Sequence, residues 1–413
     1  MRKQRFIPYK TKIQYAGPFC DKKDINAMIQ SIKKGWFGVG KSARKFEEEF
    51  ARFLGVKEVI VVNSGSSANL LSLAALNFNH GSEVITSACT FPTAFNPIIQ
   101  NNLVPVVVDI KLDTYNIDPD LIEQAISDKT KALMLVHNLG NPCEMDKIMK
   151  IARKYDLTVI EDNCDALGSI YDGKLTGTFG DISTSSFYVA HHITMGEGGA
   201  VCTNDFRLAE KIRSLRDWGR ACACKICVVA LDRNSKCIKR HNTKRTGLPE
   251  GYDNRYSYTS IGYNLKPLDS QCAMGIEQLK RLDQFIKIRK NNFHQLYDFF
   301  RQYEDFFILP KWPDKSEPSW FAFPLSVRSD APFERIEIIR FLEERNIETR
   351  LIFAGNIIRH PAYAKVKIRV CTSLDNADEV MRNSFFLGVW PGITAKMMEF
   401  IKDSIDEFTA KYR

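Results

Sequence analysis

The feature that most constrains this chain is a series of short runs rich in apolar and β-branched residues between residues 58 and 203. Most of the runs are separated by segments long enough for a helix; they cover residues 58–62, 83–86, 104–108, 132–136, 157–160, 182–189 and 199–203. Strands that are apolar on both faces and joined by helical crossovers form parallel sheets buried between layers of helices. We therefore predict an α/β fold with a mainly parallel seven-stranded sheet flanked by helices.

The second half of the chain has a different pattern. The sequence predicts a long amphipathic helix from about residue 266 to residue 290, followed by closely spaced prolines at Pro310, Pro313, Pro318, Pro324 and Pro332. We predict a large domain over residues 1–285 and a smaller C-terminal α+β domain over residues 286–413. A polar, cysteine-rich segment, residues 220–258, is too long for an ordinary connection and is predicted to be an insert in the large domain.

The composition limits the classes of binding partner and the cellular compartment that we expect for this protein. A net charge of +9 favours an anionic partner, yet the basic residues are dispersed and no nucleic-acid-binding motif is present, so we expect a phosphorylated small molecule and no nucleic acid. Residues 1–17 lack the apolar core of a signal peptide, and no stretch has the roughly 18 apolar residues of a membrane span. Eleven cysteines, an odd number, favour reduced thiols. We therefore expect a cytoplasmic protein with no membrane partner.

Two strand ends carry candidate binding residues. The stretch Asn63-Ser64-Gly65-Ser66-Ser67 offers backbone amides and hydroxyls at a helix start, which suit a phosphate but also serve as an ordinary N-cap. Glu161-Asp162 ends a buried strand, where open α/β sheets bind their ligands. A carboxylate there suits the protonated ring nitrogen of a pyridoxal-phosphate cofactor, or it is a loop acid that caps the next helix. Each motif alone leaves both interpretations open.

The order of several motifs narrows these interpretations. Along the chain come Gly65-Ser66, Thr90-Phe91, Glu161-Asp162, Ser186-Phe187, Gly196-Glu197-Gly198-Gly199 and Gly262-Tyr263-Asn264-Leu265. This order resembles the sugar aminotransferases of the DegT/DnrJ/EryC1 family, a branch of the fold-type I pyridoxal-phosphate proteins. The resemblance spans nearly the whole chain. It implies a fold-type I aminotransferase-like architecture whose large domain binds the cofactor.

The resemblance also implies a role for each matching residue. Asp162 would face the pyridine nitrogen, Phe91 would stack on the ring, and Asp165 would join the cofactor-binding residues. The residues that would hold the phosphate are Gly65, Ser66, the amide of Ser67, Ser186 and Asn264. The last of these would reach the phosphate from a neighbouring subunit, which implies at least a homodimer.

One position departs from the aminotransferase pattern. Those enzymes carry, five residues before the Gly-Glu-Gly-Gly motif, a lysine that forms a covalent imine with the cofactor; here that position is His191. Imidazole forms no such stable imine, but it moves protons near neutral pH. We therefore expect pyridoxamine phosphate to be held non-covalently and His191 to act as a general base, with His192 as its supporting neighbour. The alternative is a turn histidine that only makes local hydrogen bonds.

The same histidine marks the sugar 3-dehydratases of this family, and cysteines distinguish two kinds of them. One kind carries a [2Fe–2S] cluster, and this sequence resembles it at Cys164, Cys222, Cys224 and Cys237, with fifty-seven residues between the first two. The gap between Cys224 and Cys237 is longer than the resemblance implies, so we expect an insertion there, and Cys227 is a rival ligand. Four thiolates also suit zinc, held by Cys222, Cys224, Cys227 and Cys237, or the thiols are free.

Together these residues predict C3 deoxygenation of a nucleotide-linked 4-keto-6-deoxyhexose, with CDP-4-keto-6-deoxyglucose as the expected substrate, in the pathway to the 3,6-dideoxyhexoses of bacterial O-antigens. By resemblance, the electrons would come from a separate NAD(P)H-dependent flavin iron–sulfur reductase. Two alternatives stay open. One is a cluster-free enzyme that acts on GDP-4-keto-6-deoxymannose and regenerates its amine from glutamate. The other is a zinc-stabilised, non-catalytic relic of an aminotransferase.

Overall fold

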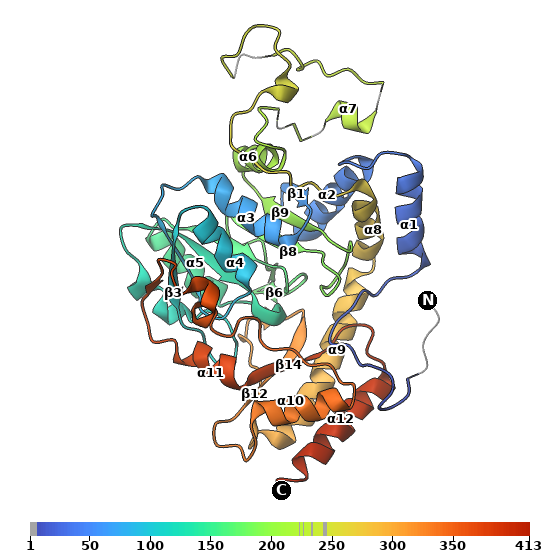
Figure 1. The fold of residues 1–413 in the computed structure, drawn as a ribbon, viewed down its shortest axis with the longest axis vertical. Coiled ribbons are helices and arrows are strands. Elements are labelled where there is room, and N and C mark those ends of the chain that lie inside the picture. The colour runs from blue at the N-terminus through green and yellow to red at the C-terminus, as the bar shows by residue number, and fades with distance from the viewer. Residues whose placement is uncertain (1–5, 223, 226, 233, 243–245) are drawn as a thin grey trace.

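A large mixed sheet is the centre of the molecule (Figure 1). The computed structural model of this 413-residue chain describes residues 6–222, 224–225, 227–232, 234–242 and 246–413. The strands, in their spatial order, are β1 (Glu58–Val62), β9 (Gly199–Thr203), β8 (Ile182–Ser186), β5 (Thr158–Asp162), β4 (Thr130–Val136), β2 (Glu83–Ser87), β3 (Val104–Val108) and β13 (Arg369–Val370). From β8 to β13 the neighbours are parallel, whereas β9 is antiparallel to both β1 and β8.

The predicted α/β architecture with a mainly parallel sheet is confirmed, with two differences in its strands. The seven predicted strands are present, and β13 adds an eighth at the β3 edge. A two-residue strand has too little periodicity to be detected in sequence, and it is held by tertiary contacts such as the ion pair from Arg369 Nη2 to Glu83 Oε2 at 2.5 Å. The predicted run 182–189 also ends early, because the chain leaves the sheet after Ser186.

Helices cover both faces of this sheet, as the alternation of its side chains requires. In β1, Val59 and Val61 pack with α2 (Lys41–Leu54) on one face, while Ile60 and Val62 pack with α3 (Gly65–Leu76) and α6 (Phe206–Arg216) on the other. The first face also carries α5 (Met145–Lys154) and α8 (Asp269–Leu279), and the second carries α4 (Pro92–Gln100). All five residues of β1 are buried, as expected for a strand covered on both sides.

The long helix predicted over residues 266–290 is wrong in its extent. The structure has two helices, α8 and α9 (Leu282–Phe300), with a break at Lys280 and Arg281. Arg281 leaves helical geometry at a φ of −111° and a ψ of 1°, and its guanidinium bonds both carboxylate oxygens of Asp24 in α1 (Lys22–Lys33) at 2.5 Å. The predicted domain boundary, between residues 285 and 286, therefore lies within one continuous helix, α9.

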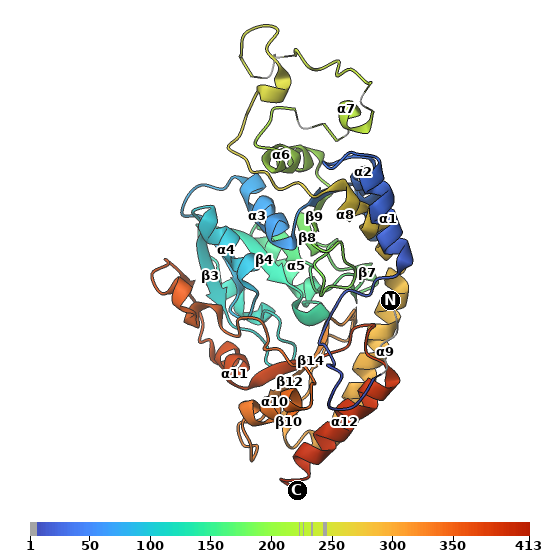
Figure 2. The ribbon, with the colours of Figure 1, turned by 45° about the vertical axis from the view of Figure 1, so that its right-hand side comes forward.

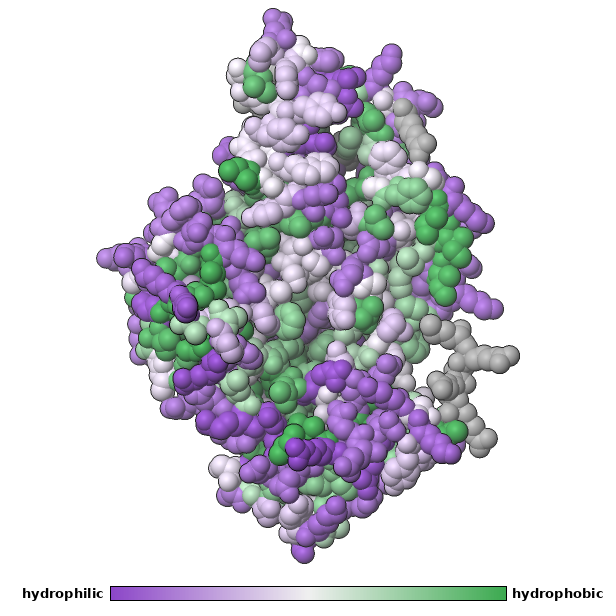
Figure 3. Space-filling model, in the orientation of Figure 1, coloured by the Kyte–Doolittle hydropathy of each residue, from purple (hydrophilic) through white to green (hydrophobic). Residues whose placement is uncertain are grey.

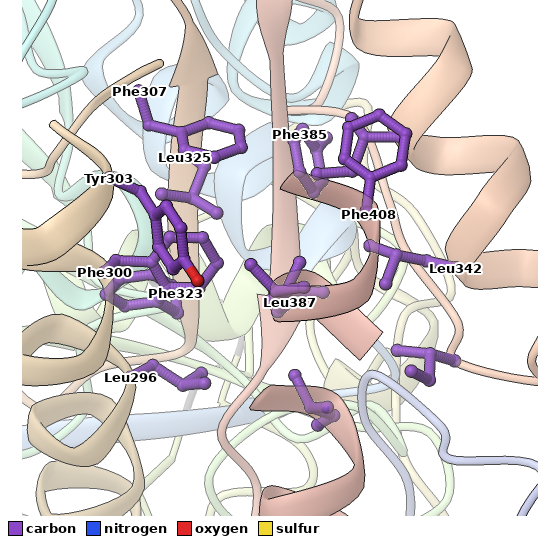
Figure 4. Packing of buried hydrophobic residues seen from close by; sticks show 14 of the residues in the cluster. Leu296, Phe300, Tyr303, Phe307, Phe323, Leu325, Leu342, Phe385, Leu387 and Phe408 are labelled. Carbon is purple, nitrogen blue, oxygen red and sulfur yellow. The ribbon is translucent and has the colours of Figure 1, made fainter. Parts of the chain in front are cut away.

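The C-terminal part of the chain builds a second core beside the large sheet. A three-stranded antiparallel sheet, β10 (Phe307–Ile308), β12 (Ala322–Val327) and β14 (Ser384–Gly388), packs against α9, α10 (Arg335–Glu344) and α12 (Ala395–Thr409). Aromatic and aliphatic side chains fill the space between them (Figure 4), among them Phe300, Phe323 and Leu387. The N-terminal segment belongs to this core as well, because Ile13 is buried in it and pairs with Ile347.

Three smaller features complete the fold. The cysteine-rich segment 220–258 extends beyond α6, at the top of Figures 1 and 2, and its described part contains α7 (Val228–Leu231). A small sheet of β6 (Ile170–Tyr171), β7 (Lys174–Leu175) and β11 (Ser316–Glu317) ties the large sheet to the C-terminal part, and α11 (Asp375–Asn383) precedes β14. Among the described residues, none of the helices combines the length and the apolar composition that crossing a membrane requires.

The face of the molecule drawn in Figure 3 is largely polar, and α1 carries an apolar stripe. Figure 3 shows hydrophilic residues over much of one face and an apolar patch at the right-hand edge, where α1 lies. Ile25, Ile29 and Ile32 recur at helical spacing on α1, and each side chain is 40–47% exposed. Such a stripe on a helix surface is typical of an interface with another chain.

Candidate active site

A cavity of about 580 Å³ lies at the carboxyl ends of the parallel strands, where the chain also contributes residues from its C-terminal part. Eight of the predicted site residues line it: Gly65, Ser66, Phe91, Asp162, Cys164, Asp165, Ser186 and His191. From the other side come Phe321, Arg350, Phe353 and Phe386, with Tyr15 from the N-terminal segment. The structure thus brings together residues that are up to 371 positions apart in sequence, from Tyr15 to Phe386, at the strand ends where open α/β sheets bind their ligands.

The start of α3 forms one wall of the cavity. Ser64 caps the helix, because its Oγ accepts a hydrogen bond from the amide of Ser67 at 3.1 Å. A side chain at Gly65 would place its Cβ 2.6 Å from Ser186 Cβ and 3.1 Å from Cys164 Sγ, so only glycine lets the helix start lie this close to β8. Gly65, Ser66 and Ser186 thus form a cradle suited to an anion at the positive end of a helix. The Ser67 amide is already used by the N-cap.

Asp162 is a buried carboxylate held by two donors. Asn69 Nδ2 donates to Asp162 Oδ2 at 2.7 Å, and the amide of Cys164 donates to Oδ1 at 3.1 Å. Thr184 Oγ1 donates to Asn69 Oδ1 at 2.6 Å and so fixes the amide that holds the carboxylate. Burial raises the pKa of Asp162. No cationic side chain of the described residues pairs with it, so a protonated ring nitrogen in the cavity would supply the missing positive charge.

His191 sits in the turn that follows β8. Its ring lies against Phe321 with centroids 5.5 Å apart, and its Nδ1 lies 3.3 Å from Asp165 Oδ1. The contact does not meet hydrogen-bond geometry, so the pair is an electrostatic contact. Of the described residues that line the cavity, none is a lysine. An imidazole and a carboxylate, rather than an amine, therefore lie beside Asp162.

His192 points away from the cavity. Its Nε2 lies 2.8 Å from the carbonyl oxygen of Ser319, and its side chain is buried. Burial and the nearby Arg289 lower the pKa of His192 well below its usual value, so it is a neutral donor to Ser319. This bond anchors the His191 turn to the start of the C-terminal core, which is a supporting contact as the sequence suggests.

Phe91 and Asn264 occupy different surroundings. Phe91 precedes α4 and leaves 51% of its side chain exposed beside the cavity, where it meets Phe353 edge to face at 6.1 Å. Asn264 is exposed, pairs through its backbone with Asp217, and is not among the residues that line this chain's cavity. The single chain therefore leaves Asn264 available to a neighbouring molecule, and its role there stays a prediction.

The predicted metal ligands fall into two places. Cys164 lines the cavity, where burial and Asp162 raise its pKa well above the usual range. Cys222 and Cys224 lie together in the cysteine-rich segment with their Sγ atoms 3.7 Å apart, and Cys237 is close enough to affect the pKa of Cys222. Within the described ranges, no group of three or more His, Cys, Asp or Glu side chains is placed to hold one metal ion. The structure therefore places Cys222 beside Cys224 but does not bring the four predicted ligands together.

Three residues around the site have no signal in the sequence. Asn69 is an ordinary-looking residue in an apolar helix, yet it orients Asp162. Arg289 lies in the middle of α9, yet its guanidinium is buried behind His191 and donates to the carbonyl of Phe321 at 3.0 Å. Arg350 reaches the cavity from the C-terminal part, over the ring of Tyr15 and paired with Glu348 at 2.6 Å. Each acquires its place through contacts across long stretches of chain.

The chain is similar to known proteins over nearly its whole length. The profile of the DegT/DnrJ/EryC1/StrS aminotransferase family matches residues 18–406. The chain belongs to this family. Among the similar proteins are dTDP-4-dehydro-2,6-dideoxy-D-glucose 3-dehydratase of Saccharopolyspora spinosa, 45% identical over 98% of this chain and 88% of that protein, and the lipopolysaccharide biosynthesis protein RfbH of Salmonella typhimurium, 44% identical over 98% of this chain and 93% of that one.

Solved structures of this family share the fold. The E. coli GDP-4-keto-6-deoxy-D-mannose-3-dehydratase with bound hydrated PLP superimposes with a TM-score of 0.84 at 29% identity, covering 95% of this chain and 100% of that one. The predicted fold-type I aminotransferase-like architecture is thereby confirmed, and the chain is a member of a pyridoxal-phosphate family that includes nucleotide-sugar 3-dehydratases.

Proposed function

We propose that this DegT/DnrJ/EryC1/StrS family member is a pyridoxamine-phosphate-dependent 3-dehydratase of a nucleotide-linked 4-keto-6-deoxyhexose. The observation that carries the proposal is the imidazole of His191 in a cavity with Asp162 and, among its described lining residues, no lysine. An aminotransferase needs an amine there to bind the cofactor covalently, whereas a dehydratase needs only a proton-transfer group.

The cavity fits the cofactor in three respects. Asp162 is a buried carboxylate in need of a cation, which suits the pyridine nitrogen. Gly65, Ser66 and Ser186 form the cradle for the phosphate, and Phe91 presents an exposed ring beside them. When bound, the cofactor would supply an amine that condenses with the sugar ketone and a ring that accepts electrons.

Residues of the chain would hold the cofactor in its protonated form, transfer protons and limit the access of water. Asp162 keeps the ring nitrogen protonated, because its carboxylate is fixed by Asn69 and has no other described cation to neutralise it. The C3 hydroxyl of the sugar would leave as water, which requires that one proton be removed from the bound cofactor and passed to the hydroxyl. His191 would accept this proton and pass it on at its Nε2, the ring nitrogen remote from Asp165. The residues of the C-terminal part close one side of the cavity and limit the access of water.

A lysine substitution tests the position of His191. The His191→Lys variant should form a covalent imine with pyridoxal phosphate and show a new visible absorption band that borohydride removes. His192→Lys is the matched control, since that side chain faces Ser319 instead of the cavity, and it should show no such band. A His191→Lys protein that binds pyridoxal phosphate without an imine would contradict the placement of His191. A wild-type protein that binds neither form of the cofactor would favour a non-catalytic relic.

For the substrate we propose CDP-4-keto-6-deoxyglucose. The support is the combination of the His191 site with the cysteine-rich segment, although two of the similar proteins carry names with a dTDP-linked and a GDP-linked sugar. An assay of anaerobic protein with CDP-, GDP- and dTDP-linked 4-keto-6-deoxyhexoses decides between them, and preferred turnover of another nucleotide overturns this assignment.

We also propose that Cys164, Cys222, Cys224 and Cys237 hold a [2Fe–2S] cluster, reduced by an NAD(P)H-dependent flavin iron–sulfur reductase in a reducing, cytoplasmic compartment. The pair Cys222 and Cys224, 3.7 Å apart, supports it. As arranged in the single chain, the described thiols do not fit around one cluster, so we derive no step through it. Iron with acid-labile sulfide in anaerobically purified protein is the expected result. Zinc alone, which Cys227 would help to bind, overturns it.

A second candidate function rests on the similarity to GDP-4-keto-6-deoxy-D-mannose-3-dehydratase in both sequence and structure. Such an enzyme would need no cluster and would use glutamate to regenerate the cofactor amine. One assay distinguishes the two functions. Glutamate supports turnover, with release of ammonia, if the protein is the cluster-free enzyme, whereas a reductase supports turnover if it is the cluster-dependent enzyme.

We further propose that the chain acts as at least a homodimer in which Asn264 reaches the partner's phosphate cradle. Asn264 is exposed and lies outside its own cavity, and the apolar stripe Ile25, Ile29 and Ile32 offers a face for a second chain. Light scattering of the purified protein tests the assembly. An Asn264→Ala variant that dimerises and binds pyridoxamine phosphate about ten-fold more weakly is the expected outcome, since one phosphate hydrogen bond is lost.

A further inference from the structure

We propose that Asp165 is a positioning residue for His191, and that its carboxylate keeps the imidazole proton on Nδ1 so that Nε2 is free to accept a proton in the cavity. The inference deepens the proposed function and rests on it for its catalytic consequence, although the pairing itself can be measured in the protein without substrate. The family resemblance implies that Asp165 contacts the cofactor, whereas this proposal gives it His191 as its partner.

The geometry of the pair supports this assignment. Asp165 follows β5 and His191 follows β8, so neighbouring parallel strands deliver the two side chains to the same edge of the sheet. Asp165 Oδ1 lies 3.3 Å from His191 Nδ1, and both side chains are at most 15% exposed. Nδ1 is shielded from solvent, while the ring as a whole lines the cavity. The Asp165 carboxylate therefore faces Nδ1, and Nε2 is left free to take part in the reaction.

A buried arginine lies behind the pair and interacts electrostatically with Asp165. The guanidinium of Arg289 is 1% exposed, and Asp165 is the anion that acts on it. Arg289 also donates to the carbonyl oxygens of Phe321 at 3.0 Å and of His191 at 3.4 Å, so it ties the histidine turn to the ring that packs against the imidazole. A buried guanidinium without a nearby anion would be costly, and the electrostatic effect of Asp165 lowers this cost.

The chemical consequence concerns the tautomer of His191. A neutral imidazole has one protonated nitrogen, and the hydrogen bond made by the other decides which. With the proton held on Nδ1 by Asp165, Nε2 has a free lone pair and can accept a proton. Asparagine at position 165 can instead donate its amide N–H to Nδ1, which places the imidazole proton on Nε2 and blocks it as a base.

Three measurements distinguish this proposal from a role of Asp165 in cofactor binding: the tautomer of His191, the affinity for pyridoxamine phosphate and the rate of turnover. In ¹⁵N-histidine-labelled protein, long-range proton–nitrogen spectra should show His191 with a protonated Nδ1, assigned by the loss of its signals in His191→Gln. Asp165→Asn should reverse this tautomer and lower kcat about 100-fold or more. KM and the dissociation constant of pyridoxamine phosphate should stay within about three-fold, because Asp165 does not hold either ligand. Asp165→Glu should recover part of the rate.

The matched control is Asp172→Asn, an exposed turn residue with a positive φ of 48° that asparagine also adopts readily. It should match the wild type in every readout. If Asp165→Asn keeps the His191 tautomer but binds pyridoxamine phosphate ten-fold more weakly, Asp165 is a cofactor ligand and the proposal is overturned. If wild-type His191 has the predicted tautomer and the protein turns over none of the keto sugars, the proposed function fails while the pairing stands.

Discussion

Asn69 donates a 2.7 Å hydrogen bond from α3 to Asp162 at the end of β5, across 93 positions of sequence. The amides of Asn69 and Cys164 both donate to the carboxylate, so Asn69 helps to fix the orientation of Asp162. Thr184 extends the arrangement by donating to Asn69.

Removing this amide should weaken the cofactor site. In Asn69→Ala, Asp162 loses its shorter hydrogen bond, worth about 1.4 kcal/mol, and pyridoxamine phosphate should bind about ten-fold more weakly. Thr184→Val keeps Asn69 and removes only the bond that orients it, so a smaller loss, about three-fold, is expected. Fluorescence titration with pyridoxamine phosphate measures both. Equal affinity of Asn69→Ala and wild type would show that the cofactor does not use Asp162.

The close approach of α3 to β8 predicts a steric effect at Gly65. An alanine there would place its Cβ 2.6 Å from Ser186 Cβ, and relieving this overlap should cost about 1–3 kcal/mol of stability and distort the anion cradle. The control is Gly38→Ala, where the nearest atom to a new Cβ is Trp36 Nε1 at 3.9 Å. Urea unfolding and cofactor titration should show a loss for the first variant alone. A Gly65→Ala protein with unchanged cofactor affinity would argue against a phosphate at this helix start.

His192 should make the stability depend on pH. Its pKa is lowered in the folded protein, so below pH 6.5 the unfolded chain takes up a proton that the folded chain does not. The free energy of unfolding should therefore fall with decreasing pH, by at most about 1.4 kcal/mol per pH unit for this one group. His192→Gln keeps a donor for Ser319 but does not titrate, so its curve should be flatter between pH 6.5 and pH 5. His80→Gln, an exposed site, is the control and should run parallel to the wild type.

Asp269 should stabilise the fold more than an ordinary helix cap does. It lies in the first turn of α8 but accepts hydrogen bonds from the start of α2, at 3.0 Å from the Gly40 amide and 2.9 Å from the Ala43 amide. Asp269→Ala leaves these buried donors unpaired and should cost about 3 kcal/mol. Asp205→Ala removes an exposed cap from α6 and should cost about 1 kcal/mol. Denaturant unfolding of both variants checks the difference, and equal losses would contradict it.

Local pattern accounts for most of what the sequence predicted correctly. Seven apolar runs became strands because a strand buried on both faces needs a continuous apolar stretch, and the residues after 62, 161 and 186 reached one cavity because parallel strands end at one edge. The helix predicted over residues 266–290 was wrong in its extent, since the chain breaks at Arg281, where the guanidinium pairs with Asp24, far away in sequence. The residues that surround Arg281 in the sequence do not indicate that it pairs with Asp24.

The sequence by itself determined the seven main strands and the edge of the sheet where the cavity lies, since both depend on periodicity. It also predicted, from its place in a motif, that His191 occupies the position of a family lysine. Only the tertiary structure decided that Asn69 holds Asp162, that Asp165 and Arg289 lie behind His191, and that Cys164 lies apart from the pair Cys222 and Cys224. The physical reason is that these relationships are distances between side chains on different elements. They exist only after hydrophobic burial has fixed how the elements pack.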